Sequence, residues 1–559
     1  MNTDTDWFAS FRTSKEYALL FSRPIAYFSA EYAFFEHEQT YAGGLGVLAG
    51  DFLREASDQE LPVAAVGLYY KEGYLYHEAF SNEAVLKHTI TKLPEEVGLI
   101  PVVTETGERV IIEIPMADKT LYAQAWLKKL GSVSLYLLDT NISQNDVTSQ
   151  NITQRLYTGD KEIRFKQEMV LGIGGMRLLH TLNINPIVYH LNEGHSALLS
   201  YEILHHEMTR HKKGFLEAIT QSKQRIVFTN HTLIAAGNDT FSKEMVSALL
   251  MGYAQQLQIP VEDLLSLGIV QDTSIFSMTS LALRMAGKVN AVSNLHAQKA
   301  AEIWSDHTMM AVTNGIHIPT WNCIKNDERL IEEHAANKKV LLSYIAEKTG
   351  QQWKEETILL GWARRMVAYK RPLALFEDIQ RFIVTARNKG REMNVVLAGQ
   401  AHESDEEGGK TLAKLQEMIT NELKGTVVYL PHYTMSLAKM MTSGTDVWLN
   451  TPVVGFEACG TSGMKACLNG SLPCTTDDGW IHGVNLYGIG WMLNSDHINQ
   501  SLLDTLEKNI VPLYYDQKQQ WQENMKHSRE LIFNEFTATK MLRHYIEFMY
   551  KEAMDTQHI

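Results

Sequence analysis

A single lysine, Lys465, lies within FEACGTSGMKACLNGS (456–471), a run of glycines, hydroxyl-bearing residues and small apolar residues. The run is not a nucleotide-binding P-loop, because the glycine spacing differs and Ala466 stands where Ser or Thr would coordinate magnesium. Its composition predicts a glycine-rich entry into a helix. Lys465 is then either an exposed lysine with its amine in water or a desolvated amine in a small apolar pocket.

The neighbours of Lys465 favour the pocket, since they are small and mostly apolar: Ala458, Gly460, Met464, Ala466, Cys467 and Leu468. A desolvated lysine loses part of its preference for the charged form, so its amine can attack an aldehyde. An aldehyde that also carries a phosphate would use the helix dipole and the amides of Gly460, Thr461, Ser462 and Gly463. Pyridoxal phosphate on Lys465 fits this description and, from the residues alone, is one option among several.

A second group of cations lies in GWARRMVAYKRP (361–372), directly after a predicted strand. Arg364, Arg365, Lys370 and Arg371 fall close together in a chain that is acidic overall. Such a run is often a solvated helix face. Because the two arginines follow an apolar strand, we expect them instead at the rim of a cleft, where arginine and lysine together bind an oxyanion.

Glycines dominate YAGGLGVLAGD (41–51), at the first predicted strand-to-helix turn. Gly43, Gly44 and Gly46 permit a ligand to approach the backbone closely, or they form a tight turn only. Their spacing is not that of the dinucleotide-binding GxGxxG motif, and no acidic residue stands ready to bind a ribose. Nicotinamide chemistry is therefore not expected.

Polar side chains end three further predicted strands: Asn192, Glu193 and His195; Asn230 and His231; and Thr313, Asn314 and His317. Any one of them could be a buried, satisfied polar group. Three consecutive strands that end in amides and imidazoles favour the recognition of sugar hydroxyls. By contrast, HHEMTRH (205–211) has poor spacing for metal ligands on a helix, so we expect a solvated face and no metal.

The elements that must position these residues follow from the hydrophobic pattern. Short apolar runs alternate with amphipathic stretches, which is typical of parallel sheets built from βαβ units. A first series of predicted strands comprises 25–30, 63–70, 186–192, 225–232, 289–294 and 311–316. A second series, after a helix-favouring segment at about 322–356, comprises 358–363, 394–399, 426–430 and 446–450. Ligands of such sheets bind at the carboxyl ends of the strands.

The composition narrows the class of partner. A chain of 559 residues predicts two or three domains, and 51 Lys and Arg against 65 Asp and Glu give a net charge of −14. Nucleic acid is therefore not expected as the main partner. The four cysteines lack CxxC spacing and are expected to be reduced. No signal-peptide pattern or membrane-length apolar run occurs, so we expect a cytoplasmic protein without a membrane partner.

Taken together, these motifs resemble the α-glucan phosphorylases, the family of glycogen, starch and maltodextrin phosphorylase, and are most similar to its short bacterial branch. AYFSAEYAF, YAGGLGVLAGD, LNEGHSA, TNHT, TNGIH, RRMVAYKR and FEACGTSGMKACLNG occur in the family's order between about 25 and 485. The last motif resembles the cofactor-lysine signature of the family. Related nucleotide-sugar glucosyltransferases usually carry a second glutamate where Lys465 stands.

The resemblance implies an α/β fold of GT-B architecture, with two Rossmann-like doubly wound domains facing across a deep cleft. We expect an N-terminal domain at 1–320, with a β-hairpin insertion near 100–140. The pyridoxal-phosphate-binding domain is expected at 321–535, and a C-terminal helix at 536–559 is expected to pack back near the domain junction. The resemblance also implies a homodimer.

The reaction implied by the resemblance is reversible phosphorolysis of a terminal α-1,4-linked glucose of a glucan or maltooligosaccharide. Orthophosphate is the acceptor and glucose 1-phosphate the product. Lys465 would hold pyridoxal phosphate, whose phosphate would be bound by Arg364 and the amides of Gly460, Thr461, Ser462 and Gly463. Arg365, Lys370 and the Gly44 amide would bind the substrate phosphate. The glucosyl unit would contact His231, Asn314, Glu457, Cys459 and Gly460, and the neighbouring pocket would be lined by Asn192, Glu193 and His195.

Four positions depart from the family pattern without removing the implied chemistry, among them Arg364, where the large phosphorylases have a lysine, and Thr434, where they have an arginine. Cys459 replaces the usual serine beside the sugar, and Gln400 stands where a lysine is common. Two alternative functions therefore stay open: a nucleotide-sugar-dependent glucosyltransferase resembling glycogen synthase, and a glucan-binding homologue without activity.

Overall fold

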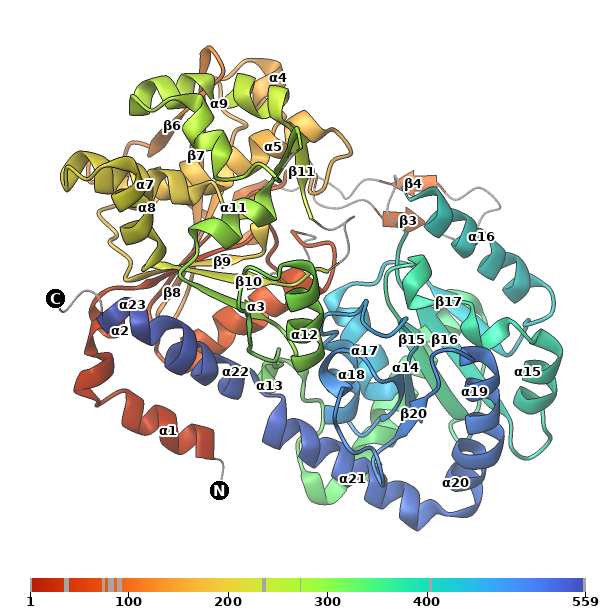
Figure 1. Ribbon diagram of the computed structural model, residues 1–559. Helices are drawn as coiled ribbons and strands as arrows, with labels where there is room; N and C mark the ends of the chain where they lie inside the picture. The colour runs from red at the N-terminus through yellow and green to blue at the C-terminus, as the bar shows by residue number, and fades with distance from the viewer. Residues whose placement is uncertain are drawn as a thin grey trace.

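Two large sheets, each accompanied by helices, organise the chain (Figure 1); the first is mostly parallel with antiparallel strands at one edge, and the second is parallel throughout. The computed structural model describes residues 3–34, 40–72, 76–78, 85–87, 93–233, 238–271, 273–401 and 405–555. The α/β class predicted from the hydrophobic alternation is thereby confirmed, and the parallel sheets are consistent with the GT-B architecture.

The first sheet has ten strands. Nine lie in the order β14 (Met310–Ala311), β13 (Lys288–Ala291), β10 (Ile226–Asn230), β9 (Val188–Asn192), β1 (Ile25–Phe28), β2 (Val63–Leu68), β8 (Val133–Asp139), β7 (Lys119–Leu130) and β5 (Ile100–Pro101), and β6 (Ile111–Met116) pairs with β7. The strands from β14 to β8 are parallel. The chain leaves β1 for β2 on one side and later returns to β9 on the other, so the strand order reverses between β1 and β9.

The second sheet is parallel throughout. Its order is β17 (Val427–Leu430), β16 (Met393–Ala398), β15 (Ile358–Ala363), β18 (Val447–Asn450), β19 (Leu472–Thr476) and β20 (Trp491–Leu493). Here the order reverses between β15 and β18. Ligands of doubly wound sheets bind at the strand ends beside such reversals. The topology therefore predicts two binding positions, one beside β1 and β9 and one beside β15 and β18.

Every strand predicted in the two series corresponds to an observed strand. The antiparallel hairpins expected near 100–140 are present as β6 with β7 and β7 with β8. β8 is also almost wholly buried and pairs in parallel with β2. These strands therefore extend the first sheet. Two small antiparallel pairs complete the described strands: β3 (Tyr76–Glu78) with β4 (Val85–Lys87), and β11 (Thr240–Ser242) with β12 (Ile275–Ser277).

Helices cover both faces of the sheets. Those of the first part are α1 (Thr3–Phe11), α2 (Ala18–Ser22), α3 (Gly44–Asp58), α4 (Val147–Gln150), α5 (Lys161–Met169), α6 (Gly175–Thr181), α7 (Leu199–Arg210), α8 (Phe215–Lys223), α9 (Lys243–Leu257), α10 (Val261–Ser266), α11 (Met278–Met285), α12 (Asn294–Ile303) and α13 (Ile318–Trp321). Successive residues of β1 enter opposite cores, with Phe28 in one and Tyr27 in the other, as the two-residue period of a strand requires.

The later helices are α14 (Leu330–Thr349), α15 (Ile379–Ala386), α16 (Glu406–Thr420), α17 (Met435–Gly444), α18 (Ser462–Leu468), α19 (Ile498–Thr505), α20 (Val511–Asp516), α21 (Lys518–Glu535), α22 (Ala538–His544) and α23 (Lys551–Asp555). The last two return to the first sheet, where they lie near α1 and α3 (Figure 1). Among the described helices, none combines the length and the apolar character that a membrane crossing needs. The domain limits at 320 and 535 stay a prediction.

Candidate active site

An apolar cluster joins the two sheets and contains the helix of the predicted cofactor lysine. It combines Ala33, Val292, Ile316 and Trp321 with Met435, Ala438, Cys459, Met464, Cys467, Leu468, Trp480, Ile481, Leu486, Ile532 and Phe536. Two hydrogen bonds cross the same junction: Ser293 Oγ donates to the Ala458 carbonyl at 2.7 Å, and Asn314 Nδ2 donates to the Cys459 carbonyl at 3.3 Å. The first half therefore holds the loop that precedes α18.

Lys465 lies on α18 and is buried in this junction, with 5% of its surface exposed. Its Nζ lies 3.9 Å from the centroid of the Trp321 ring and donates to Thr461 Oγ1 at 3.1 Å. Burial lowers the pKa of Lys465 to about 8, although the charge of Asp51 opposes that shift. Of the two interpretations of Lys465, the desolvated amine is the correct one.

Asp51 is a buried acid near Lys465 that the sequence pattern did not reveal. Its fully buried carboxylate accepts the Trp321 indole N–H at 2.9 Å with each oxygen, and burial raises its pKa. Helix α3 thus brings an acid under the same tryptophan that faces Lys465. Asp51 ends the glycine-rich motif 41–51, and its position at the end of this motif is the sequence signal that points to it.

Replacing Asp51 by asparagine is expected to lower the pKa of Lys465 further, because the carboxylate charge favours the protonated amine. Competitive acetylation of cofactor-free protein across a pH series, with peptide mapping by mass spectrometry, measures this pKa. Lys410, an exposed lysine of α16, is the internal reference. An unchanged titration midpoint for Lys465 in Asp51→Asn would show that the two groups are not coupled.

The predicted oxyanion cluster gathers at the reversal of the second sheet. Arg364 follows β15, and its Nη1 contacts Asn450 Oδ1 at the end of β18. Arg364 Nη2 lies 2.6 Å from Glu457 Oε1, and Lys370 Nζ lies 3.6 Å from Glu457 Oε2. Arg365 is exposed beside them. The expectation that both arginines sit at a rim is wrong for Arg364, whose side chain is 4% exposed because Glu457 and Asn450 bind it.

Burial and charge act against each other in this cluster. Burial lowers the pKa of Lys370 to about 7, while Glu457 favours its charged form. For Glu457, burial alone would raise the pKa, but Arg364 and Lys370 outweigh it and hold the pKa below its usual value. Glu457 is therefore ionised at neutral pH, and one carboxylate balances two cations that face it.

Glycines let these groups approach the loop before α18. A Cβ atom on Gly460 would lie 2.5 Å from Arg364 Nη2 and 2.9 Å from Glu457 Oε1, so a larger residue would displace these two charged groups. Thr461 precedes α18, and Ser462 and Gly463 are its first residues, whose amides have no acceptor within the helix. Gly44 likewise begins α3. Gly44 is exposed, and as a first-turn residue its amide has no acceptor within the helix.

Residues at the end of β9 and β10 form a second polar group, at the reversal of the first sheet. His231 Nε2 is bonded to Asn192 Oδ1 at 2.6 Å, and the His231 amide donates to Glu193 Oε2 at 2.9 Å. Burial lowers the pKa of His231 to about 3, so its imidazole is neutral. Glu193 has a φ of 77°, a conformation that costs free energy in a non-glycine residue and is often found at functional sites.

The remaining predicted site residues divide between ligand-facing and structural positions. Among the described residues, the buried atoms Asn314 Oδ1 and His195 Nδ1 have no hydrogen-bond partner. His195 Nε2 lies 3.5 Å from Asp239 rather than beside His231. Cys459 is buried. Asn230 and His317 instead make hydrogen bonds to other side chains of the protein, to His296 and to Asp58, respectively.

The pH dependence of stability offers a test of the Glu193 geometry. Burial raises the pKa of Glu193 from 4.5 to about 7. The folded state thus binds this proton more tightly than the unfolded chain does. Its stabilising contribution is complete below about pH 4.5 and is lost as the pH rises through about 7.

We expect Glu193→Gln to lack this contribution. The free energy of unfolding of the wild type, relative to the variant, should fall by on the order of 3 kcal/mol between about pH 4 and pH 8. Urea titrations at several pH values measure the difference. A difference that does not vary with pH would mean that Glu193 titrates normally.

Two further side chains support the site without having been predicted. Glu31 Oε2 accepts the amides of Ala42 at 2.7 Å and Gly43 at 3.2 Å, which orders the turn before Gly44. Asp478 Oδ2 accepts the Glu457 amide at 3.0 Å. Both carboxylates act across long stretches of sequence, and no local pattern points to them.

The fold and the site define a doubly wound α/β protein with polar groups at both strand-order reversals and a buried lysine between the sheets. A family model described as carbohydrate phosphorylase matches residues 324–485. The maltodextrin phosphorylase of Thermococcus litoralis is 33% identical, over 99% of this chain and 73% of that protein. Glycogen phosphorylases of Mycobacterium tuberculosis (31%; 95% of this chain and 71% of that protein) and Aquifex aeolicus (30%; 96% and 88%) are also similar.

The chain therefore belongs to the carbohydrate phosphorylase family. The resemblance inferred from the motifs is confirmed, and the protein is an enzyme of the glycosyltransferase class.

Proposed function

We propose that this enzyme is an α-1,4-glucan phosphorylase that uses pyridoxal phosphate. The observation that carries the proposal is the position of Lys465: a desolvated amine between the two sheets, on the helix that follows a glycine loop packed against Arg364 and Glu457. Membership of the family, and the names of similar proteins as maltodextrin and glycogen phosphorylases, support the substrate class.

The residues around Lys465 fit the cofactor. The amine is buried and its pKa is lowered to about 8, which favours reaction with an aldehyde. Amides of Gly460, Thr461, Ser462 and Gly463, together with the Arg364 guanidinium, would hold the phosphate group. Bound pyridoxal phosphate would supply a second phosphate group able to act in proton transfer.

In the proposed reaction, the bond between C1 of the terminal glucose and the glycosidic oxygen breaks, and a bond from C1 to a phosphate oxygen forms. Arg365, Lys370 and the Gly44 amide bind the substrate phosphate. That phosphate gives its proton to the departing oxygen. The products are α-glucose 1-phosphate and a glucan shortened by one unit, so atoms and charges balance.

The remaining residues hold the sugar. Glu457, Asn314, Cys459 and Gly460 contact the glucosyl unit in this proposal, and the unpartnered Asn314 Oδ1 would accept a sugar hydroxyl. The carbonyl of His231 would face the positive charge that develops at C1. Asn192, Glu193 and His195 would line the neighbouring pocket. We also propose the homodimer implied by the resemblance.

The test is a product assay on the full chain loaded with pyridoxal phosphate. With maltoheptaose and orthophosphate we expect glucose 1-phosphate, and none without phosphate. Transfer of glucose from a nucleotide sugar without any glucose 1-phosphate would instead identify the glucosyltransferase alternative. Binding of maltoheptaose with neither product would identify an inactive glucan-binding homologue.

A further inference from the structure

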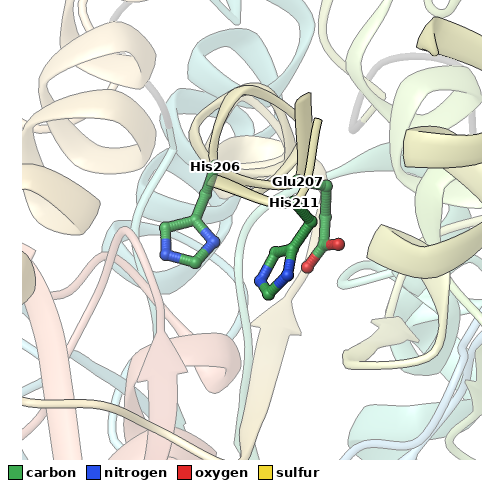
Figure 2. A group of neighbouring side chains, drawn as sticks. All are labelled: His206, Glu207 and His211. Atoms are coloured by element: carbon green, nitrogen blue, oxygen red, sulfur yellow. The ribbon is translucent and has the colours of Figure 1, made fainter. Parts of the chain in front are cut away.

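Three side chains come together at the outer end of α7, in the segment 205–211 that the sequence assigned to a solvated face. His206 and Glu207 lie in the last turns of the helix, and His211 follows its end. One ligand atom from each lies within 4.8 Å of the others. Figure 2 shows the three side chains leaving the helix end toward the same space. The helical spacing looked poor for metal ligation because His211 lies beyond the helix, where the chain turns.

The donor set has the chemistry of a transition-metal site. Two imidazoles and one carboxylate are a known zinc-binding combination, with water completing the coordination, whereas calcium and magnesium prefer oxygen ligands alone. The Glu207 side chain is 11% exposed. Water therefore screens its charge less than that of a surface carboxylate, and its attraction for a cation is stronger.

The three ligand atoms need to move only slightly closer together to bind one zinc ion. Ligand atoms on a tetrahedral zinc lie about 3.4 Å apart when the bonds are about 2.1 Å long. The rings of His206 and His211 have centroids 5.6 Å apart. His211 is exposed, so its side chain can rotate toward the other two without disturbing the core.

One competing charge is present. Lys213 Nζ lies 3.3 Å from Glu207 Oε2 and neutralises the carboxylate. A divalent cation would replace this partly exposed ammonium, which can move into water at little cost. Removing Lys213 should therefore strengthen metal binding, an effect opposite to that of removing a ligand.

We propose that His206, Glu207 and His211 bind Zn²⁺ or a chemically similar divalent transition cation. The site lies at the C-terminal end of α7, the helix that follows Asn192, Glu193 and His195. The 12 residues of α7 span about 18 Å along the helix axis. Bound metal links the last turn of α7 to the segment that leads into α8 and so stabilises the folded chain.

The experiment titrates zinc chloride into the full-length, metal-stripped protein in competition with a chromophoric zinc indicator. We expect one zinc per chain, and at least about tenfold weaker binding in His206→Ala and in His211→Ala. Lys213→Ala should bind zinc more tightly. His205→Ala changes a neighbouring histidine of the same helix and should behave like the wild type.

The proposal is overturned if the wild type takes up no zinc, or if both ligand variants bind it as the wild type does. Circular dichroism checks that the variants fold, and His211→Ala alters only an exposed side chain, so at least one variant reports on binding. Because the readout is metal affinity, its outcome is independent of whether the enzyme is a glucan phosphorylase.

Discussion

Lys465→Ala is expected to abolish phosphorolysis while the protein still folds. Removal of a single electrostatic group from a reaction centre already costs about 10²–10³ in rate, and Lys465 would hold the whole cofactor. We therefore expect a loss of about 10³-fold or more in glucose 1-phosphate formation from maltoheptaose and phosphate. The variant should also lack the absorption of bound pyridoxal phosphate.

Lys410→Ala is the matched control, since it removes an exposed lysine of the same half of the chain. It should leave both activity and absorption unchanged. A Lys465→Ala variant that kept wild-type activity would exclude Lys465 as the cofactor residue, whatever the fate of the control.

Glu457→Gln is expected to destabilise the fold strongly. The substitution keeps the shape of the side chain but leaves the buried Arg364 and Lys370 facing a neutral amide. Breaking a buried ion pair by neutralising one partner costs about 3–5 kcal/mol, because an uncompensated charge stays buried. Urea titration at pH 7 measures the loss in the free energy of unfolding.

A double-variant cycle shows whether the carboxylate compensates Lys370. In Glu457→Gln/Lys370→Met the second buried cation is gone, so part of the stability should return, with a coupling of about 0.5–3 kcal/mol. The exposed pair of Lys410 and Glu406 in α16 is the control, and Glu406→Gln should have no measurable effect. Strictly additive losses in the cycle would contradict the compensation that the structure indicates.

The sequence predicted the strands well because each is a short buried run. β1, β9 and β15 are buried along their whole length, and β18 is buried except at Asn450. Burial on both faces is typical of parallel strands covered by helices. The place of β8 in the first sheet was harder to predict from the sequence. Its alternation with β7 suggested a local hairpin, and only the parallel pairing with β2, a long-range contact, attaches it to the main sheet.

The site was predictable where residue type and strand position coincided. Arg364 directly follows β15, and Asn192 ends β9, so their places at the strand-order reversals followed from the pattern. Lys465 followed from its small neighbours. The roles proposed for these residues in binding sugar and phosphate remain predictions.

What the sequence could not show depends on contacts between distant segments. The burial of Arg364 follows from Glu457 and Asn450, which lie far along the chain. Asp51 comes near Lys465 only because Trp321 contacts both side chains, the carboxylate of α3 and, across the junction, the amine of α18. The approach of His211 to His206 depends on the turn after α7, which helical spacing does not describe.

The central claim is that Lys465 carries pyridoxal phosphate. The most direct measurement is borohydride reduction of the cofactor-loaded protein, followed by peptide mapping with mass spectrometry. The account predicts a pyridoxyl group on the peptide that contains Lys465, with loss of the cofactor's absorption band on reduction. A cofactor-replete protein whose Lys465 peptide stays unmodified would contradict it.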